Sequence, residues 1–191
     1  MVIGITGGIG SGKSTICRAL GAMGFTIYDC DFWASFLMNS DASVINQIKS
    51  HFSDQIYSAD GVLDRRLLAS KVFNDTAQLK ILESIVHTAL FTHLEGFISQ
   101  NRDKIVIVES AILFESGFNK IIDKVITISA PESLRIDRAM SRDCATRAQI
   151  KERVAKQMSD AQREKLADFT IICDDYRSVI VPILDIIDTK F

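Results

Sequence analysis

One eight-residue segment limits the possible folds of this chain more than any other feature. Residues 7–14 read Gly-Gly-Ile-Gly-Ser-Gly-Lys-Ser and match the pattern G-x-x-x-x-G-K-[ST] in full. The segment directly follows an apolar, β-branched run at residues 2–6 and precedes a stretch of helical period that contains Ile16, Leu20 and Met23. A glycine-rich turn between a strand and a helix is the context in which this pattern surrounds phosphate groups.

The residue types in this turn suit a nucleoside triphosphate. Glycines allow successive backbone N–H groups to converge on a phosphate, and the following helix adds the positive end of its dipole. We expect Lys13 to reach the β- and γ-phosphates and the Ser14 hydroxyl to bind Mg²⁺. A dinucleotide-binding G-x-G-x-x-G pattern fails, because it would need glycine where Lys13 stands. The ATP-binding residues expected in this turn are Gly8, Gly10, Ser11, Gly12, Lys13, Ser14 and Thr15.

Short runs without polar alternation recur along the chain and alternate with longer segments of helical period. Such runs are typical of strands buried on both faces of a parallel sheet with helical crossovers. The pattern predicts an α/β fold of the P-loop NTPase type: three α/β/α layers around a five-stranded parallel sheet. The five runs are residues 2–6, 26–28, 105–108, 125–128 and 169–172.

The spacing of the runs is uneven and predicts two helical additions to one sheet core. The first gap carries an apolar stripe from Leu79 to Leu94, and Asp64 is placed to cap a helix that includes Val72 and Phe73. The second gap begins with Ala-Pro-Glu at residues 130–132 and continues as a charged helical stretch. We expect a core of about residues 1–29, 101–131 and 167–191, an acceptor-binding helical insertion of about 30–100 and a lid of about 132–166.

Composition and charge exclude several classes of protein. The 191 residues include 22 Lys and Arg against 24 Asp and Glu, so a net charge of −2 gives no basic coat for nucleic acid or an anionic membrane. The most apolar run outside the strands, residues 179–187, is too short to span a membrane and contains Pro182 and Asp185. The four cysteines show no metal-ligand spacing. We therefore expect a cytoplasmic protein that binds neither nucleic acid nor membrane.

Two of the predicted strands end in acidic residues. Asp29 and Asp31 close the second run, and either carboxylate could take the proton from a hydroxyl that receives a phosphoryl group. Capping of the helix that starts near Phe32 is the competing interpretation for each of them. Glu109 ends the third run, where an acidic residue commonly holds Mg²⁺ through water, so Ser14 and Glu109 are the expected metal residues.

Arginines gather on one face of the second helical addition. Arg135, Arg138 and Arg142 are spaced i, i+3 and i+7 along the stretch. Residues 132–165 carry a charge of +3 in a chain of −2. Planar guanidinium groups that close over a polyphosphate are what the lid of a kinase supplies, so Arg138 and Arg142 are expected to bind ATP and Arg138 to act in catalysis beside Lys13.

Several segments together resemble the dephospho-coenzyme A kinase family. Residues 4–15 are similar to its first strand and P-loop, and Asp29-Cys30-Asp31 resembles its Asp-x-Asp. Three later segments, in the same order as in the family, make the resemblance specific over nearly the whole chain. They are Asp-Gly-Val-Leu-Asp-Arg at residues 60–65 followed by Val72-Phe73, Leu-Phe-Glu at 113–115, and Ala-Asp at 167–168.

The resemblance implies phosphorylation of the ribose 3′-hydroxyl of dephospho-CoA by ATP with Mg²⁺, which is the last step of coenzyme A synthesis. Asp31 is the base that it implies, and we expect Arg65 and His87 to join Asp31 in binding the acceptor, in a monomer or weak homo-oligomer. This sequence has His87-Thr88 where the family usually has His-Pro, and Glu109-Ser110-Ala111 where it has Asp-x-Pro. Cys173-Asp174-Asp175 replaces the family's Asn-x-Gly.

The sequence patterns of two other functions can be compared with those of a kinase. A GTPase normally recognises guanine through Asn-Lys-x-Asp, and Asn119-Lys120-Ile121-Ile122 lacks the aspartate. A nucleotide-binding module without turnover would not need Lys13, Ser14 and Asp31 together, and all three are present. The residues therefore favour a small-molecule kinase.

Overall fold

The computed structural model describes residues 1–72 and 75–190 and divides the chain into two compact units. The first, here called the sheet unit, comprises Met1–Tyr28 and Gln100–Phe191. The second, the helical unit, is Asp29–Ser99. Acceptor binding by residues 30–100 and a lid formed by residues 132–166 remain predictions. Phe73, which belongs to two of the sequence patterns above, lies outside the described residues.

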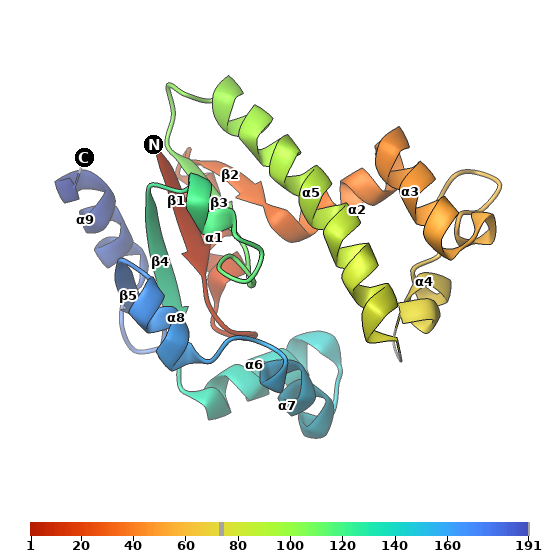
Figure 1. Ribbon diagram of the computed structural model, residues 1–191. Helices are drawn as coiled ribbons and strands as arrows, with labels where there is room; N and C mark the ends of the chain where they lie inside the picture. Colours follow the sequence, from red (N-terminus) through yellow and green to blue (C-terminus); the bar gives the residue numbers. More distant parts are fainter. Residues whose placement is uncertain (73–74, 191) are drawn as a thin grey trace. The chain divides into compact units, whose positions relative to one another are not determined.

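A five-stranded sheet forms the centre of the sheet unit, in the order β2-β3-β1-β4-β5 (Figure 1). β1 pairs in parallel with both β3 and β4, and β4 pairs in parallel with β5. The predicted five-stranded parallel sheet is therefore confirmed. The strands are β1 (Val2–Thr6), β2 (Thr26–Asp29), β3 (Val106–Glu109), β4 (Lys124–Ser129) and β5 (Phe169–Ile172).

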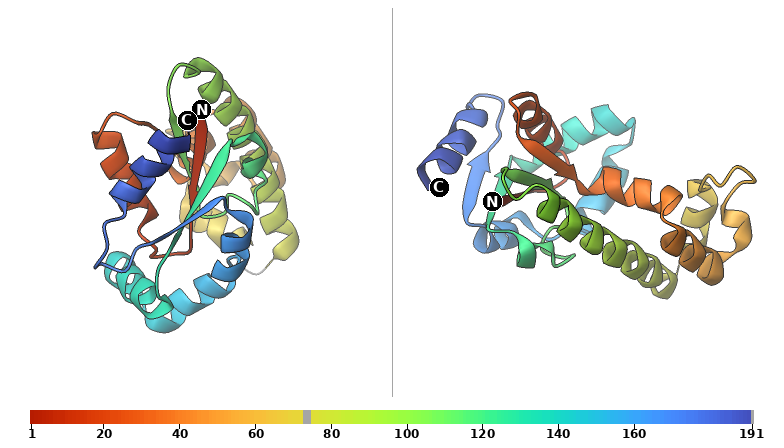
Figure 2. Two further views of the ribbon diagram at one scale, coloured as in Figure 1. Left: turned by 90° about the vertical axis from the view of Figure 1, so that its left-hand side faces the viewer. Right: turned by 90° about the horizontal axis from the view of Figure 1, so that it is seen from above.

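Helices cover both faces of this sheet and make the predicted three layers. α1 (Lys13–Ala22) and α9 (Ile180–Lys190) lie on one face, and α8 (Asp160–Leu166) lies against β4 on the other (Figure 2). The core beneath α1 and α9 consists mainly of β-branched and leucine side chains, which suit strands with no solvent-facing side. Its most buried members, each at most 2% exposed, are Ile3, Ile5, Ile16, Cys17, Leu20, Ile107, Ile126, Ile128 and Ile183.

The Ala-Asp segment before β5 has a structural task. The Asp168 side chain accepts a hydrogen bond from the Val125 backbone N–H at 2.9 Å and one from Lys124 Nζ at 2.9 Å. The Asp168 backbone N–H donates to the Val125 carbonyl at 2.9 Å. These contacts fix the register in which β5 joins β4.

The helical unit has its own core and aspartate caps at four helix starts, where Asp75 caps the last helix by accepting from the backbone N–H groups of Ala77 and Gln78. Asp29, Asp41 and Asp64 each accept hydrogen bonds from backbone N–H groups of the following helix, and the predicted cap at Asp64 is thereby confirmed. The buried side chains of this core include Val44, Ile48, Ile56, Leu63, Leu68 and Ile85. The helices are α2 (Cys30–Ser40), α3 (Ala42–Phe52), the short η1 (Asp54–Ile56), α4 (Arg65–Val72) and α5 (Thr76–Gln100), whose last residue falls in the sheet unit.

The charged stretch after β4 is divided into three helices. α6 (Glu132–Asp143) ends at Cys144, whose positive φ of 51° breaks the helical path. α7 (Arg147–Ala155) and α8 each begin with a capping box, in which a hydroxyl residue and a glutamine three residues later satisfy each other's backbone N–H groups. Between β3 and β4 lies a short 3₁₀ turn, η2 (Phe118–Ile121). Among the described helices, none combines the length and the hydropathy of a membrane-spanning segment.

The pH dependence of stability follows from two histidines on α5. Burial lowers the pKa of His87, with Glu83 opposing the shift, and burial also lowers the pKa of His93, in both cases below the ordinary 6.5. As the pH falls through 6.5, the unfolded chain therefore binds protons before the folded chain does. We expect the free energy of unfolding, measured by urea titration, to decrease as the pH drops below 6.5. The double variant His87→Gln/His93→Gln should show a flatter profile, and an unchanged slope would contradict this account.

Candidate active site

The glycine-rich turn forms a phosphate cradle between β1 and α1. Its lysine is buried, and Lys13 Nζ donates to the carbonyl oxygens of Gly7 at 2.8 Å and Gly8 at 3.2 Å. The buried Ser11 Oγ has no hydrogen-bond partner within the described protein. A turn that holds an ammonium group and offers an unsatisfied hydroxyl has the donors that a polyphosphate needs, so the residues present fit a nucleoside triphosphate.

Two glycines of the cradle let α6 and α8 approach it closely. A Cβ atom on Gly10 would lie 2.0 Å from the Arg135 carbonyl oxygen, and Gly10 also has a positive φ of 75°. A Cβ atom on Gly8 would lie 2.2 Å from Arg135 Nη1 and 3.3 Å from Arg163 Nη2. Only glycine fits these positions without displacing backbone or buried guanidinium groups.

Arg135, Arg163 and Asp160 form a buried charge cluster behind the cradle. The two guanidinium side chains are each 3% exposed and share one carboxylate: Arg135 Nη2 to Asp160 Oδ2 measures 2.5 Å, and Arg163 Nη2 to Asp160 Oδ1 measures 3.1 Å. Arg135 also donates to the carbonyl oxygens of Ala130 and Ile9. Burial lowers the pKa of Arg163, and the nearby carboxylates of Asp160 and Glu115 oppose that shift.

A cavity of about 330 Å³ opens beside the cradle within the sheet unit. Four of its lining side chains are cations, so it suits a strongly negative ligand. The predicted ATP residues Arg138 and Arg142 line it, whereas Arg135 is buried in the charge cluster instead. The lining residues are Gly10, Gly12, Lys13, Ser14, Thr15, Arg18, Arg138, Ala139 and Arg142.

The two lining arginines of α6 are positioned by different partners. Arg138 donates to the carbonyl oxygens of Gly10 at 3.3 Å and Cys173 at 3.1 Å, and it forms an ion pair with Asp175. These bonds tie α6 to the segment after β5. Arg142 is exposed and pairs with its neighbour Asp143 at 2.8 Å. Arg138 is therefore the more firmly positioned of the two.

Ser14 ends the cradle and Glu109 ends β3, and their side-chain oxygen atoms lie next to each other. Ser14 Oγ donates to Glu109 Oε1 at 2.5 Å, and Glu109 is buried. A hydroxyl and a carboxylate are the hard oxygen ligands that Mg²⁺ prefers, usually with several water molecules, so the pair fits that ion. Among the described residues, no group of three or more His, Cys, Asp and Glu gathers to hold a metal.

The aspartate pair after β2 separates into a cap and an exposed carboxylate. Asp29 Oδ1 accepts from the Phe32 backbone N–H at 3.0 Å and so begins α2. The cap that sequence could not assign therefore belongs to Asp29, while Asp31 lies exposed in the first turn of the helix. One turn beyond Asp31, the Arg65 guanidinium donates to Ser35 Oγ. His87 is half-buried on α5.

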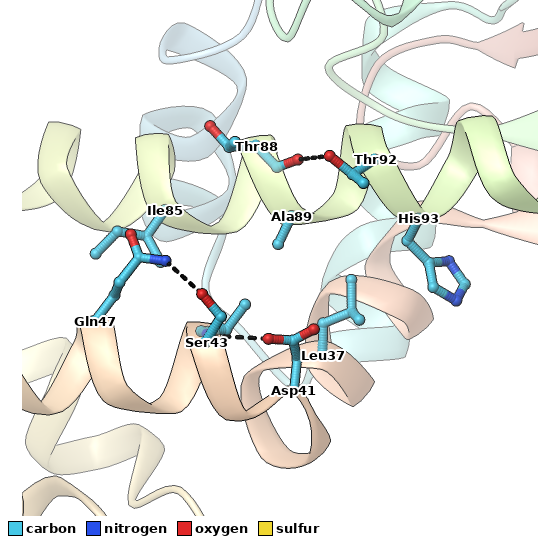
Figure 3. A pocket seen from close by; sticks show the side chains of 10 residues that line it. Leu37, Asp41, Ser43, Gln47, Ile85, Thr88, Ala89, Thr92 and His93 are labelled. Atoms are coloured by element: carbon cyan, nitrogen blue, oxygen red, sulfur yellow. Dashed lines mark hydrogen bonds between the residues drawn. The ribbon is translucent and has the colours of Figure 1, made fainter.

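The helical unit contains a separate pocket of about 410 Å³ between α3 and α5 (Figure 3). Four of its polar side chains bond one another or the backbone: Gln47 donates to Ser43, Thr92 to the Thr88 carbonyl, and Asp41 accepts from the Val44 N–H. From α2, the side chain of Leu37 lines this pocket. Since helix residues turn by about 100° each, Leu37 lies on a different side of α2 from Asp31 and Ser35.

Some important contacts carried no sequence signal. Arg163 and Asp160 belong to no motif within the charged helical stretch, and Arg18 follows the phosphate-binding pattern without belonging to it. In the Leu-Phe-Glu segment, the side chain of Glu115 accepts from the Met158 N–H at 3.1 Å and so holds the start of α8. The i, i+3, i+7 spacing of the α6 arginines could not show that Arg135 turns inward, because burial depends on the neighbouring helices.

The buried charge cluster should contribute strongly to stability. Asp160→Asn leaves two nearly buried guanidinium groups without their carboxylate, and we expect it to lower the free energy of unfolding by about 3 kcal/mol. Asp137→Asn is the matched control, because Asp137 pairs with Arg147 at 3.0 Å on the exposed surface, and its loss should cost less than about 1 kcal/mol. Denaturant titration of both variants measures the difference. Equal effects would contradict the role given to Asp160.

Known proteins resemble this chain over almost its full length. A dephospho-CoA kinase of Bacteroides fragilis is 35% identical over 186 residues, which cover 97% of this chain and 90% of the relative. The structure of TT1252 from Thermus thermophilus superposes with a TM-score of 0.87 at 29% identity, covering 100% of this chain and 97% of that one. A dephospho-CoA kinase from Campylobacter jejuni gives a TM-score of 0.73 at 28% identity, with 99% and 98% covered. The model of one family, described as dephospho-CoA kinase, matches residues 1–177, and this chain belongs to that family.

Proposed function

We propose how the residues of this chain divide the work of its family's reaction. The chain transfers the γ-phosphoryl group of ATP to dephospho-CoA and yields coenzyme A and ADP. The observation that carries the assignment of residues is the phosphate cradle with its cationic cavity, formed by Lys13, Arg18, Arg138 and Arg142. Family membership supplies the identity of the acceptor.

ATP binds with its phosphates in the cradle. The backbone N–H groups of residues 8–15 surround the β-phosphate, and Lys13 exchanges the carbonyls of Gly7 and Gly8 for phosphate oxygens. Ser11 Oγ gains the partner that it lacks within the protein. Arg138 and Arg142 stabilise the charge on the transferring group, where planar guanidinium groups bond two oxygens at once. Residues 132–166 act as the lid that excludes water from the transfer.

Ser14 and Glu109 hold Mg²⁺ in this proposal. The ion, when bound, offsets negative charge on the β- and γ-phosphates. Ser14 would contribute a direct ligand to the ion, and Glu109 would hold it through water. The existing Ser14–Glu109 hydrogen bond keeps both oxygen donors in place before nucleotide and metal arrive.

Asp31 accepts the proton of the ribose 3′-hydroxyl. The hydroxyl oxygen forms a bond to the γ-phosphorus while the bond from that phosphorus to the β,γ-bridging oxygen breaks, and ADP leaves with the bridging oxygen. Asp31 is suited to this role because its carboxylate is exposed, whereas Asp29 serves as the cap of α2. Arg65 and His87, both in the helical unit, bind the acceptor. Because its pKa is lowered, His87 does so as a neutral hydrogen-bonding ring at pH 7.

Acceptor specificity tests the proposal as a whole. Initial rates are measured with ATP and Mg²⁺ for dephospho-CoA, AMP, shikimate and gluconate at equal concentrations. We expect turnover of dephospho-CoA alone. The proposed enzyme is cytoplasmic and is a monomer or a weak homo-oligomer. Faster turnover of another acceptor would overturn the assignment.

The two aspartates after β2 should respond differently to the same change. Asp31→Asn removes the base and should lower kcat by roughly 10²–10⁴-fold, while the Kd for ATP, measured by calorimetry, stays unchanged. Asp29→Asn keeps an oxygen that accepts from the Phe32 N–H and should leave kcat nearly unchanged, whereas Asp29→Ala should cost about 1 kcal/mol of stability. If Asp31→Asn retains full turnover, Asp31 is not the base.

A further inference from the structure

An exposed pair of aromatic rings stands beside the proposed base. Phe32 and Phe36 on α2 are 57% and 48% exposed. Their ring centroids lie 6.3 Å apart at an interplanar angle of 18°, so the rings are nearly parallel. Aromatic side chains normally contribute to cores or interfaces, and two adjacent rings left in solvent mark a surface that binds something.

A third aromatic side chain, Trp33, supports both rings. Trp33 packs edge-on against both rings, with centroid distances of 5.3 Å to Phe32 and 5.4 Å to Phe36. Trp33 is itself fixed by His93 of α5 at 4.3 Å. Because the support comes from a second helix, the rings are positioned before any ligand arrives, which lowers the entropic cost of binding.

Polar and charged side chains lie on the same side of α2 as the two rings, and they indicate the chemistry of the ligand. Asp31 and Ser35 are one helical turn apart, as are Phe32 and Phe36, and all four lie within a sector of about 140°. Arg65 reaches this sector through its hydrogen bond to Ser35 Oγ. A base, a cation and two flat apolar rings are thus adjacent on one exposed helix face.

We propose that Phe32 and Phe36 form the platform on which the adenine ring of the acceptor stacks. This inference rests on the proposed function. The adenine and the reacting 3′-hydroxyl belong to the same nucleoside, so a hydroxyl at Asp31 brings the base to the neighbouring positions of the helix. Arg65 then lies beside the negatively charged diphosphate of the acceptor. Purine rings stack well on aromatic side chains, whereas the other end of dephospho-CoA, its pantetheine arm, has no ring to stack.

Kinetics of paired variants test the platform. Phe32→Leu/Phe36→Leu keeps apolar, helix-compatible side chains but removes the flat rings, and we expect the KM for dephospho-CoA to rise by about 5- to 100-fold. The KM for ATP should not change, because the cradle is untouched. Phe32→Tyr/Phe36→Tyr keeps the rings and should retain a KM within about twofold of the wild type. Val62→Ala, at a 59% exposed apolar position of the same unit, is the control.

Direct binding provides a readout that does not depend on turnover. Trp33 is the single tryptophan of the chain and touches both rings, so its fluorescence should change on titration with dephospho-CoA. 4′-Phosphopantetheine, which lacks the adenosine part, should leave the emission unchanged at the same concentrations. The double leucine variant should weaken the Kd for dephospho-CoA by the same factor as its KM.

The outcomes separate this inference from the proposed function. If the wild type phosphorylates dephospho-CoA but the double leucine variant binds and turns it over normally, the platform is refuted and the function stands. The same refutation follows if sedimentation shows that the rings join two copies of the chain and their loss only yields monomers. If the wild type does not phosphorylate dephospho-CoA, the proposed function itself fails.

Discussion

The contact of two buried guanidinium groups with the phosphate cradle is the constraint on which the rest of the sheet unit depends. Arg135 and Arg163 reach Gly8 from α6 and α8, and the single carboxylate of Asp160 holds both. Desolvating two cations is costly, and the shared carboxylate of Asp160 offsets part of that cost, although Arg163 Nε and Nη1 have no hydrogen-bond partner within the described protein. The helices that would close over ATP are therefore anchored, at one end, to the loop that would bind its phosphates.

Because α6 is anchored in this way, its arginines differ in their environment. Arg135 is buried in the charge cluster, while Arg138 and Arg142 line the cavity. Arg138 occupies an intermediate position, because its bonds to Gly10 and Cys173 place it without burying it. Under the proposed function, a cation placed in this way would be preorganised for the negative charge that develops on the transferred group.

Sequence predicted the sheet and the cradle well, because both depend on local patterns. The five β-branched runs became the five strands, and the turn at residues 7–14 lies between β1 and α1 as expected. Sequence failed where burial decides a residue's role. Arg135 shares its helix face with Arg138 in the pattern but not its environment, and nothing in the sequence near Asp160 indicates that this carboxylate pairs with two arginines. Which of Asp29 and Asp31 caps α2 became clear only from the hydrogen bond between the Phe32 N–H and Asp29, and the role of Asp31 as the base stays a proposal.

The position of the new phosphate on the product tests the central claim most directly. The chain is incubated with ATP, Mg²⁺ and dephospho-CoA, and the product is examined by ³¹P NMR. The account predicts one new phosphomonoester signal that couples to the ribose 3′-proton, together with an equal amount of ADP. A phosphate attached elsewhere on the acceptor, or ADP formed without any phosphorylated acceptor, would contradict it.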